Sequence, residues 1–256
     1  MSKRKNTDVQ DISNLDNSDI EEVFDEYRRQ KKILKHNFKL TQISALTQNQ
    51  KIAFSQNNLG KNLLMIGVAG TGKTFLACSF ALDDLFNSRC KKIIIIRSSV
   101  STRDQGFLPG TLQEKMSLYE SPYRDIFCEL SSGRRDVYDL LKKKEYLEFM
   151  STSYLRGTTF SDATIIVDEV QNCVDHEINS ILTRIGDNSR VILCGDHRQD
   201  DLRLLNKSSQ VSGIKNLVNT ASIMQSFATI DFSVDDIVRS GFVKEYILAR
   251  LKLNLD

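Results

Sequence analysis

Eight consecutive residues, Gly67 to Thr74, carry the clearest chemical signal in this sequence of 256 residues. They read GVAGTGKT and fit the pattern G-x-x-x-x-G-K-[ST], in which glycines let the backbone wrap around a phosphate with its N–H groups pointing inward. Average residue usage produces this pattern by chance in about 1% of chains of this length. We therefore expect a loop that binds the phosphates of a nucleotide through Gly67, Val68, Ala69, Gly70, Thr71, Gly72, Lys73 and Thr74.

The last two residues of this loop have distinct expected roles. Lys73, as a catalytic residue, reaches the β- and γ-phosphates of ATP, and the Thr74 hydroxyl ligates Mg²⁺. A predicted strand precedes the loop and a predicted helix follows it, so the helix N-terminus adds partial positive charge. The alternative is a glycine-rich connector with an accidental Lys-Thr pair, and the flanking elements disfavour it.

An acidic pair, Asp168 and Glu169, follows the apolar run from Ile165 to Val167. Asp168 is expected to hold Mg²⁺, and Glu169 to act as general base towards the attacking water. A hydrolase needs such a base, whereas a small-molecule kinase does not. The alternative is an acidic pair that starts a helix after a strand.

A polar segment, Cys194 to Gln199, follows another apolar strand and reads CGDHRQ. Ligand sites of parallel sheets lie at the carboxyl ends of strands, so Gln199 is placed to contact the γ-phosphate. Asp196 is a candidate support for the metal or the water. Taken alone, a turn with polar tips explains the segment equally well, but the two phosphate-site elements favour a functional role.

Two further residues are candidates for the same site. Gln50 can hydrogen bond both edges of adenine, although a helix that begins there with Thr47 as its N-cap is a compatible explanation. Arg239 is a candidate arginine finger for the phosphates, and the alternative is an ordinary solvated arginine.

The elements around these residues predict an α/β fold, a doubly wound parallel sheet flanked by helices. The run from Ile93 to Ile96 is typical of a parallel strand buried on both faces. We expect a polar and helical extension over residues 1–40 and a single P-loop domain over residues 41–256. The expected strands cover residues 62–66, 91–97, 164–167, 190–194 and 228–232. The expected helices cover residues 19–35, 48–56, 73–87 and 234–253, together with a charged helical run at 115–144.

The bulk composition excludes several classes of protein. The net charge is +2, so no overall basic field demands nucleic acid. No apolar run approaches the roughly 18 residues of a membrane span, and none follows the basic N-terminus as in a secretory signal. The five cysteines lack metal-ligand spacing, and we expect reduced thiols in a cytoplasmic protein, bacterial or in a phage-infected host.

The sequence resembles the PhoH-like proteins, phosphate-starvation-inducible ATPases related to superfamily 1 helicases. The resemblance covers about residues 45–250, and the GFLPG and DE-x-QN elements are its most specific parts. Val170 stands where the family usually has Ala, and Thr158 where a second Arg is common. The matching segments are GVAGTGKT at 67, GFLPGTLQEKMSLYESPYRDIF at 106, YLRGTTFSDA at 154, IIVDEVQN at 165, CGDHRQDDL at 194 and IVRSGFV at 237.

This resemblance implies a RecA-like ATPase core that uses ATP and Mg²⁺, binds RNA or single-stranded DNA and forms ring-shaped hexamers. The composition, rich in Asn, Ile and Lys, suits a bacteriophage version of the family. Such motors contact the nucleic-acid backbone after the second strand, and a solvated charged surface is an equally good interpretation of the basic residues there. The tentative nucleic-acid-binding residues are Arg97, Ser99, Arg103 and Arg156.

The length of the chain bears on assembly. Superfamily 1 helicases have two lobes and the second supplies the arginine, but too few residues follow Cys194 here for a second lobe. Arg239 therefore acts within its own lobe or reaches a neighbour, and we favour the neighbour in a closed homo-oligomer. Three functions stay open: a nucleic-acid-stimulated ATPase with helicase-like action, a nucleotide-dependent regulatory scaffold, and a small-molecule phosphotransferase, against which Glu169 and Gln199 argue.

Overall fold

The computed structural model describes residues 39–98, 112–152, 155, 157, 159–196 and 213–253, with the backbone alone given for 112–116. The chain divides after Leu40, and the unit that begins at Thr41 is described below. The sequence predictions for Ser99, Arg103, Arg156 and Gln199 lie outside the described residues.

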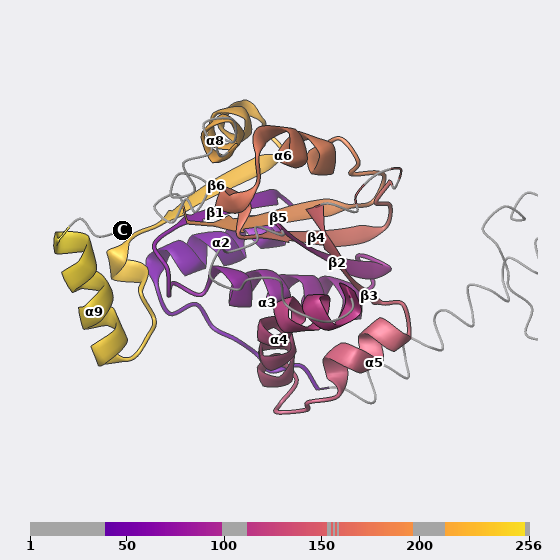
Figure 1. The fold of residues 1–256 in the computed structure, drawn as a ribbon, viewed down its shortest axis with the longest axis horizontal. Helices are drawn as coiled ribbons and strands as arrows, with labels where there is room; N and C mark the ends of the chain where they lie inside the picture. Colours follow the sequence, from indigo (N-terminus) through magenta and orange to yellow (C-terminus); the bar gives the residue numbers. More distant parts are fainter. Residues whose placement is uncertain are drawn as a thin grey trace, which may run out of the picture. The chain divides into compact units, whose positions relative to one another are not determined.

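A six-stranded, all-parallel sheet forms the centre of the domain (Figure 1). Its strand order is β3-β2-β4-β5-β1-β6, so each connection from one strand to the next crosses over a face of the sheet. This arrangement confirms the predicted α/β fold and is that of a RecA-like P-loop domain. The strands are β1 (Asn62–Gly67), β2 (Lys92–Arg97), β3 (Leu147–Ser151), β4 (Ala163–Asp168), β5 (Arg190–Gly195) and β6 (Phe227–Phe232).

Helices cover both faces of the sheet, as a doubly wound fold requires (Figure 1). One face carries α6 and α8, and the other carries α2 to α5. The α-helices are α2 (Gln48–Asn58), α3 (Lys73–Phe86), α4 (Leu112–Leu130), α5 (Val137–Lys143), α6 (Asp175–Leu182), α8 (Ile214–Ile223) and α9 (Gly241–Lys252). The short 3-10 helices are η4 (Val170–Asn172) and η5 (Val234–Asp236).

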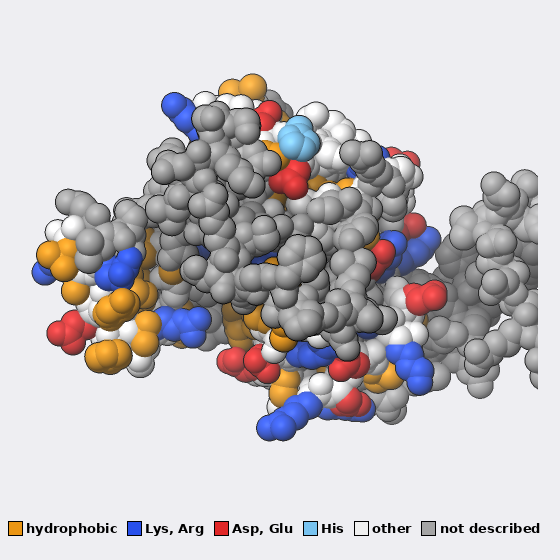
Figure 2. Space-filling model, viewed as in Figure 1, with side chains coloured by type: hydrophobic (Ala, Val, Ile, Leu, Met, Phe, Trp, Pro, Cys, Tyr) orange, Lys and Arg blue, Asp and Glu red, His pale blue; other side chains and the backbone are white. Residues whose placement is uncertain are grey.

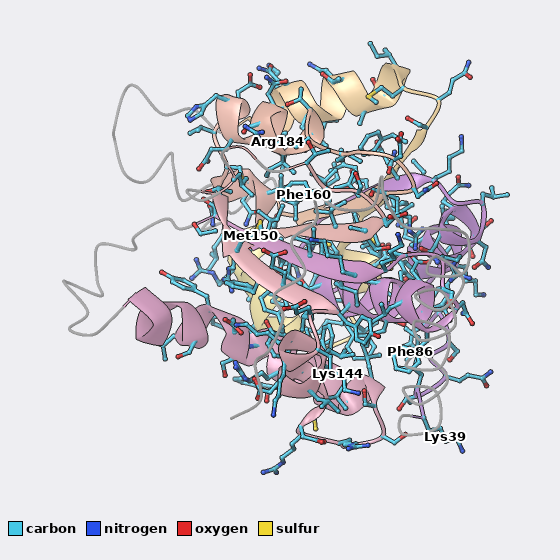
Figure 3. The ribbon with its side chains drawn as sticks, turned by 90° about the vertical axis from the view of Figure 1, so that its right-hand side faces the viewer. Lys39, Phe86, Lys144, Met150, Phe160 and Arg184 are labelled. Atoms are coloured by element: carbon cyan, nitrogen blue, oxygen red, sulfur yellow. The ribbon has the colours of Figure 1, made fainter. Side chains whose placement is uncertain are left out.

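The central strands are apolar on both faces because helices pack against both. Ile93 to Ile96 of β2 are fully buried, and they pair in register with Thr164 to Val167 of β4. In Figure 3, Phe160 lies on the side of α6 and α8, and Phe86 on the side of α3. Buried side chains therefore lie on both faces of the sheet, one layer beneath α6 and α8 and the other beneath α3.

Two predicted helices differ from the structure. The charged run 115–144 is two helices, because the chain turns at Ser132 and Gly133, which both have positive φ. The C-terminal helix starts at Gly241 instead of 234, because Ser233 caps the short η5 and Ile237 is extended. The sequence prediction also lacked β3, α6 and α8.

Candidate active site

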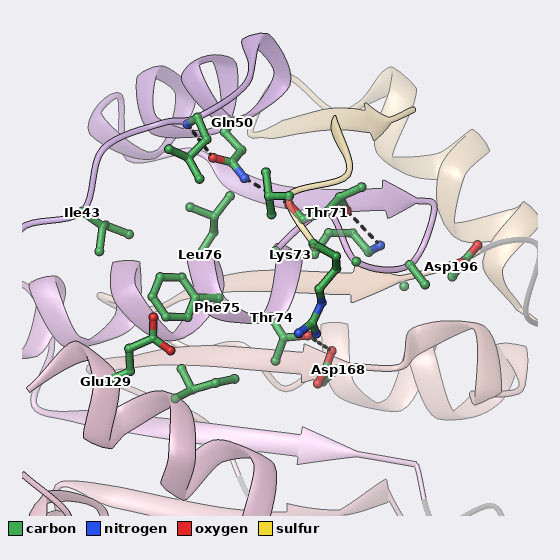
Figure 4. A pocket seen from close by; sticks show the side chains of 18 of the residues that line it. Ile43, Gln50, Thr71, Lys73, Thr74, Phe75, Leu76, Glu129, Asp168 and Asp196 are labelled. Atoms are coloured by element: carbon green, nitrogen blue, oxygen red, sulfur yellow. Dashed lines mark hydrogen bonds between the residues drawn. The ribbon is translucent and has the colours of Figure 1, made fainter. Parts of the chain in front are cut away.

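The carboxyl ends of β1, β4 and β5 lie next to one another at one edge of the sheet. Ile66 pairs with Gly195, and Val167 with Leu193, so the segments that follow these three strands emerge together. Residues at these strand ends line a pocket of about 540 Å³ (Figure 4). Its lining includes Gln50, Gly70 to Thr74, Asp168, Glu169, Asp196, Arg239 and, further along, Ile43, Leu46, Ile126 and Glu129.

The loop from Gly67 to Thr74 has the backbone conformation that its glycines allow. Gly70 and Gly72 have φ of +79° and +83°, values that a side chain disfavours. A Cβ on Gly67 would lie 2.0 Å from the carbonyl oxygen of Phe232, so glycine is required where β1 meets β6. Gly72 caps α3, whose N-terminus therefore opens directly onto the pocket.

The Lys73 side chain lies across this loop. Its Nζ donates to the carbonyl oxygens of Gly67 and Val68, at 2.8 Å each, and Figure 4 shows the side chain within the loop beside Thr71. Burial lowers the pKa of Lys73, and nearby acidic groups, Asp196 foremost, oppose that shift. The amine is thus held by two backbone carbonyls of the phosphate loop.

Both oxygens of the Asp168 carboxylate accept hydrogen bonds from neutral hydroxyls. Thr74 Oγ1 donates to Oδ1 at 3.0 Å, and Tyr123 Oη of α4 donates to Oδ2 at 2.8 Å. A hydroxyl and a carboxylate oxygen within hydrogen-bond distance form the oxygen-only donor set that suits Mg²⁺ beside a nucleotide phosphate. The structure thus brings together the two predicted metal ligands.

Tyr123 is a site residue that the sequence prediction missed. Its side chain is fully buried, and burial together with the Asp168 charge raises its pKa well above the ordinary value. The phenol consequently remains a hydrogen-bond donor at neutral pH. The available signal was its position within the segment 106–127 that carries the family resemblance.

Glu169 stands at the turn after β4 in the left-handed region, with φ of 54°. Such a conformation costs a non-glycine residue roughly 1–3 kcal/mol, and here it presents the side chain to the pocket. Gln171 Nε2 donates to Glu169 Oε2 at 2.6 Å. Burial raises the pKa of Glu169 and the Asp168 charge adds to the rise, while the Gln171 bond opposes it.

Arg97 lies close to the same carboxylate. Its Nη2 is 4.0 Å from Glu169 Oε1, and its guanidinium carbon is 5.7 Å from the centre of the Tyr119 ring. The sequence prediction assigned Arg97 to nucleic-acid contact. In the structure, Arg97 is the last residue of β2 and lies next to Glu169, the candidate general base.

The Gln50 side chain is buried and bonds to the chain itself. Oε1 accepts from the N–H of Leu46 at 2.8 Å, and Nε2 donates to the Thr71 carbonyl at 3.1 Å. Thr47 caps α2 as predicted. Each end of an amide can make a second hydrogen bond, so an adenine contact by Gln50 stays a prediction.

Arg239 lies at the P-loop of its own chain. Its Cγ is 3.0 Å from the point where a Cβ on Gly70 would stand, and the N–H of Val238 donates to the Gly70 carbonyl at 3.1 Å. Ile247 of α9 also approaches Gly70. Arg239 lines the pocket of its own chain, and its action on a neighbouring chain stays a prediction.

The parallel sheet, the phosphate loop and the adjoining carboxylates define a P-loop nucleotide-binding protein with a RecA-like fold. Within that class, residues 42–250 match the family model described as PhoH-like protein, and the chain belongs to this family.

Similar sequences come from several bacteria. The chain is 34% identical to a PhoH-like protein of Synechocystis over 72% of its length, and 33% identical to one of Bacillus subtilis over 84%. It is 30% identical to Protein PhoH of Escherichia coli over 72% of its length. It spans 55%, 66% and 51% of these three relatives, respectively.

Solved structures show a more distant similarity. The Pif1 helicase of Candida albicans has a TM-score of 0.38 and 18% identity, covering 75% of this chain and 41% of the helicase. The N-terminal domain of the bacteriophage phi29 DNA packaging ATPase has a TM-score of 0.41 and 13% identity, covering 77% of this chain and all of that domain. Within the part of the chain that the structure describes, no helix has the length and apolarity needed to cross a membrane.

Proposed function

We propose that this protein hydrolyses ATP to ADP and phosphate in the pocket between β1, β4 and β5. The proposal rests on one observation: the phosphate loop lies next to two carboxylates, Asp168 and Glu169, which have different hydrogen-bond partners. Asp168 accepts from the Thr74 hydroxyl at 3.0 Å, whereas the partly exposed Glu169 accepts from the Gln171 amide at 2.6 Å and lies 4.0 Å from Arg97. One carboxylate thus suits a metal, and the other a water molecule.

The residues divide the reaction between them. The loop amides and Lys73 bind the β- and γ-phosphates, and Glu169 accepts a proton from the attacking water. The water oxygen bonds to the γ-phosphorus as the bond from that phosphorus to the β–γ bridging oxygen breaks, and ADP leaves. Mg²⁺ held by Thr74 and Asp168 would neutralise the charge that develops on the phosphates.

Arg239 supports the same reaction from its own chain. Its position against Gly70 supports charge stabilisation at the phosphates in cis. Mixing Arg239→Ala chains with Lys73→Ala chains tests this assignment. We expect the mixture to stay as inactive as its components, and restored turnover would show that Arg239 serves a neighbouring subunit.

RNA or single-stranded DNA is the proposed effector. Support comes from the sequence resemblance and from the position of Arg97. This arginine ends β2 and lies 4.0 Å from Glu169, so a polymer bound to Arg97 would alter the surroundings of the general base Glu169. Ser99, Arg103 and Arg156 complete the proposed contact.

Steady-state phosphate release with and without each polymer, at a stated salt concentration, tests the effector. Lys73→Ala serves as the blank for contaminating ATPases. We expect turnover to rise with one polymer and the rise to weaken with added salt. Unchanged turnover would favour a nucleotide-dependent scaffold, and phosphorylation of a small molecule would favour a phosphotransferase.

The proposed assembly is a homo-oligomer, and the family resemblance implies a hexamer. The support in the structure is α9, none of whose twelve residues is buried. Phe242, Tyr246 and Val243 remain 78%, 55% and 37% exposed, and Figure 2 shows hydrophobic side chains gathered over this helix. A helix this short is marginal in water without a packing partner.

A further inference from the structure

A buried glutamine connects the candidate general base to the end of the neighbouring strand. Gln171, in η4, is 1% exposed. Its Nε2 donates to Glu169 Oε2 at 2.6 Å, and its Oε1 accepts from the N–H of Asp196 at 3.0 Å. One amide group therefore joins the segments that follow β4 and β5.

The packing around this amide leaves it little freedom. A Cβ on Gly195 would lie 2.6 Å from Val170 Cγ1 and 3.0 Å from Gln171 Oε1. The glycine that ends β5 thus creates the space that the amide occupies. The fit determines the orientation of the amide as well, because only a carbonyl oxygen can accept from the Asp196 N–H, and the nitrogen must then face Glu169.

This orientation distinguishes the two oxygens of Glu169. Oε2 accepts the hydrogen bond from Gln171, whereas the contact described for Oε1 is the Arg97 Nη2 atom at 4.0 Å. The carboxylate is consequently directed so that Oε1 is the oxygen available to a water molecule in the pocket. The Glu169 side chain has few alternative positions, because one of its oxygens is hydrogen bonded and its backbone is in the left-handed region.

We propose that Gln171 is a positioning residue for hydrolysis, which orients Glu169 towards the attacking water and couples that orientation to the backbone of Asp196 directly after β5. The inference rests on the proposed ATPase function and deepens it. Gln171 acts through Glu169, so its loss should affect turnover far more than nucleotide binding.

The test compares kcat, KM for ATP and nucleotide affinity in wild type, Gln171→Met and Gln171→Glu. Met preserves size but removes both hydrogen bonds, and Glu keeps the acceptor for Asp196 while removing the donor to Glu169. We expect kcat to fall about 10- to 100-fold in both, with KM and affinity within about threefold of wild type. Wild-type kcat in either folded variant would overturn the proposal.

A matched control separates positioning from stability. Asn57 is also a buried amide, but it bonds Arg190 at the opposite edge of the sheet, 2.7 Å from Nη2. Asn57→Ala should lower the melting temperature and leave kcat unchanged at temperatures where it is folded. If the Gln171 variants lose activity only in proportion to their unfolded fraction, the proposal fails.

A double-mutant cycle distinguishes failure of the inference from failure of the ATPase assignment. In a Glu169→Gln background, Gln171→Met should cause little further loss in the single-turnover rate. An equal loss in both backgrounds would contradict a role through Glu169. If Glu169→Gln alone turns over ATP like wild type, the assignment of the base is wrong.

Discussion

At the scale of single residues, the site depends on neutral donors that hold its two carboxylates. Tyr123 bonds Asp168, and Gln171 bonds Glu169. The loop and both carboxylates were predictable, because their types and spacing follow from contacts with phosphate, metal and water. Tyr123 was not, since it lies 45 residues from Asp168 and only the packing of α4 brings them together.

Tyr123→Phe should weaken Mg²⁺ use. The ring keeps its packing, but Asp168 loses the donor at Oδ2, and loss of such a partner typically costs 10- to 100-fold in metal affinity. We expect the Mg²⁺ concentration for half-maximal ATP hydrolysis to rise by about 10-fold. Tyr138→Phe, a change at another buried tyrosine, is the control, and an equal Mg²⁺ response in the two variants would contradict the role of Tyr123.

At the scale of elements, the edge of the sheet opposite the site is held by a buried ion pair. Asp84 of α3 accepts from Arg190 Nε of β5 at 2.6 Å and from Thr164 Oγ1 of β4 at 2.8 Å. Arg89 also donates to Asp84. The helix that opens at the phosphate loop is thereby attached at its other end to the two strands that carry the candidate carboxylates.

Asp84→Ala should destabilise the fold strongly. It leaves the mostly buried Arg190 guanidinium without its partner carboxylate, and breaking such a pair typically costs about 3–5 kcal/mol. Urea unfolding measures the change in the free energy of unfolding. Asp83→Ala, at the half-exposed neighbour that also pairs with Arg89, should stay within about 1 kcal/mol of wild type, and similar losses in the two variants would argue against a special role for Asp84.

The strands were more predictable than the helices. A run such as Ile93 to Ile96 is typical of a parallel strand covered on both faces. The edge strand β3 alternates buried and exposed residues over a short span, so it carried a weaker signal. The break between α4 and α5 depends on positive φ at Ser132 and Gly133, which residue types alone do not specify.

At the scale of the whole molecule, α9 is the surface where a second copy is proposed to bind. Its position next to Gly70 through Ile247 would link assembly to the phosphate loop. Burying one phenylalanine contributes about 1.5–3 kcal/mol. Phe242→Ser should therefore raise the dissociation constant of the assembly about 10- to 100-fold, measured by light scattering across a concentration series.

A second exposed apolar residue provides the control for assembly. Ile223, at the end of α8, is 83% exposed and belongs to a different part of the surface. Ile223→Ser should leave the molar mass unchanged. A wild-type chain that is monomeric at every concentration, or a Phe242→Ser chain that assembles like wild type, would contradict a role for α9 in assembly.

The proposed hydrolysis depends on Glu169, which accepts a proton from the water that attacks bound ATP. Its most direct test is single-turnover ATP hydrolysis by wild type and Glu169→Gln at saturating Mg²⁺, with ATP affinity measured on the same samples. We expect the rate to fall about 10²- to 10⁴-fold while ATP affinity stays within about threefold. Equal rates for the two proteins would contradict the claim.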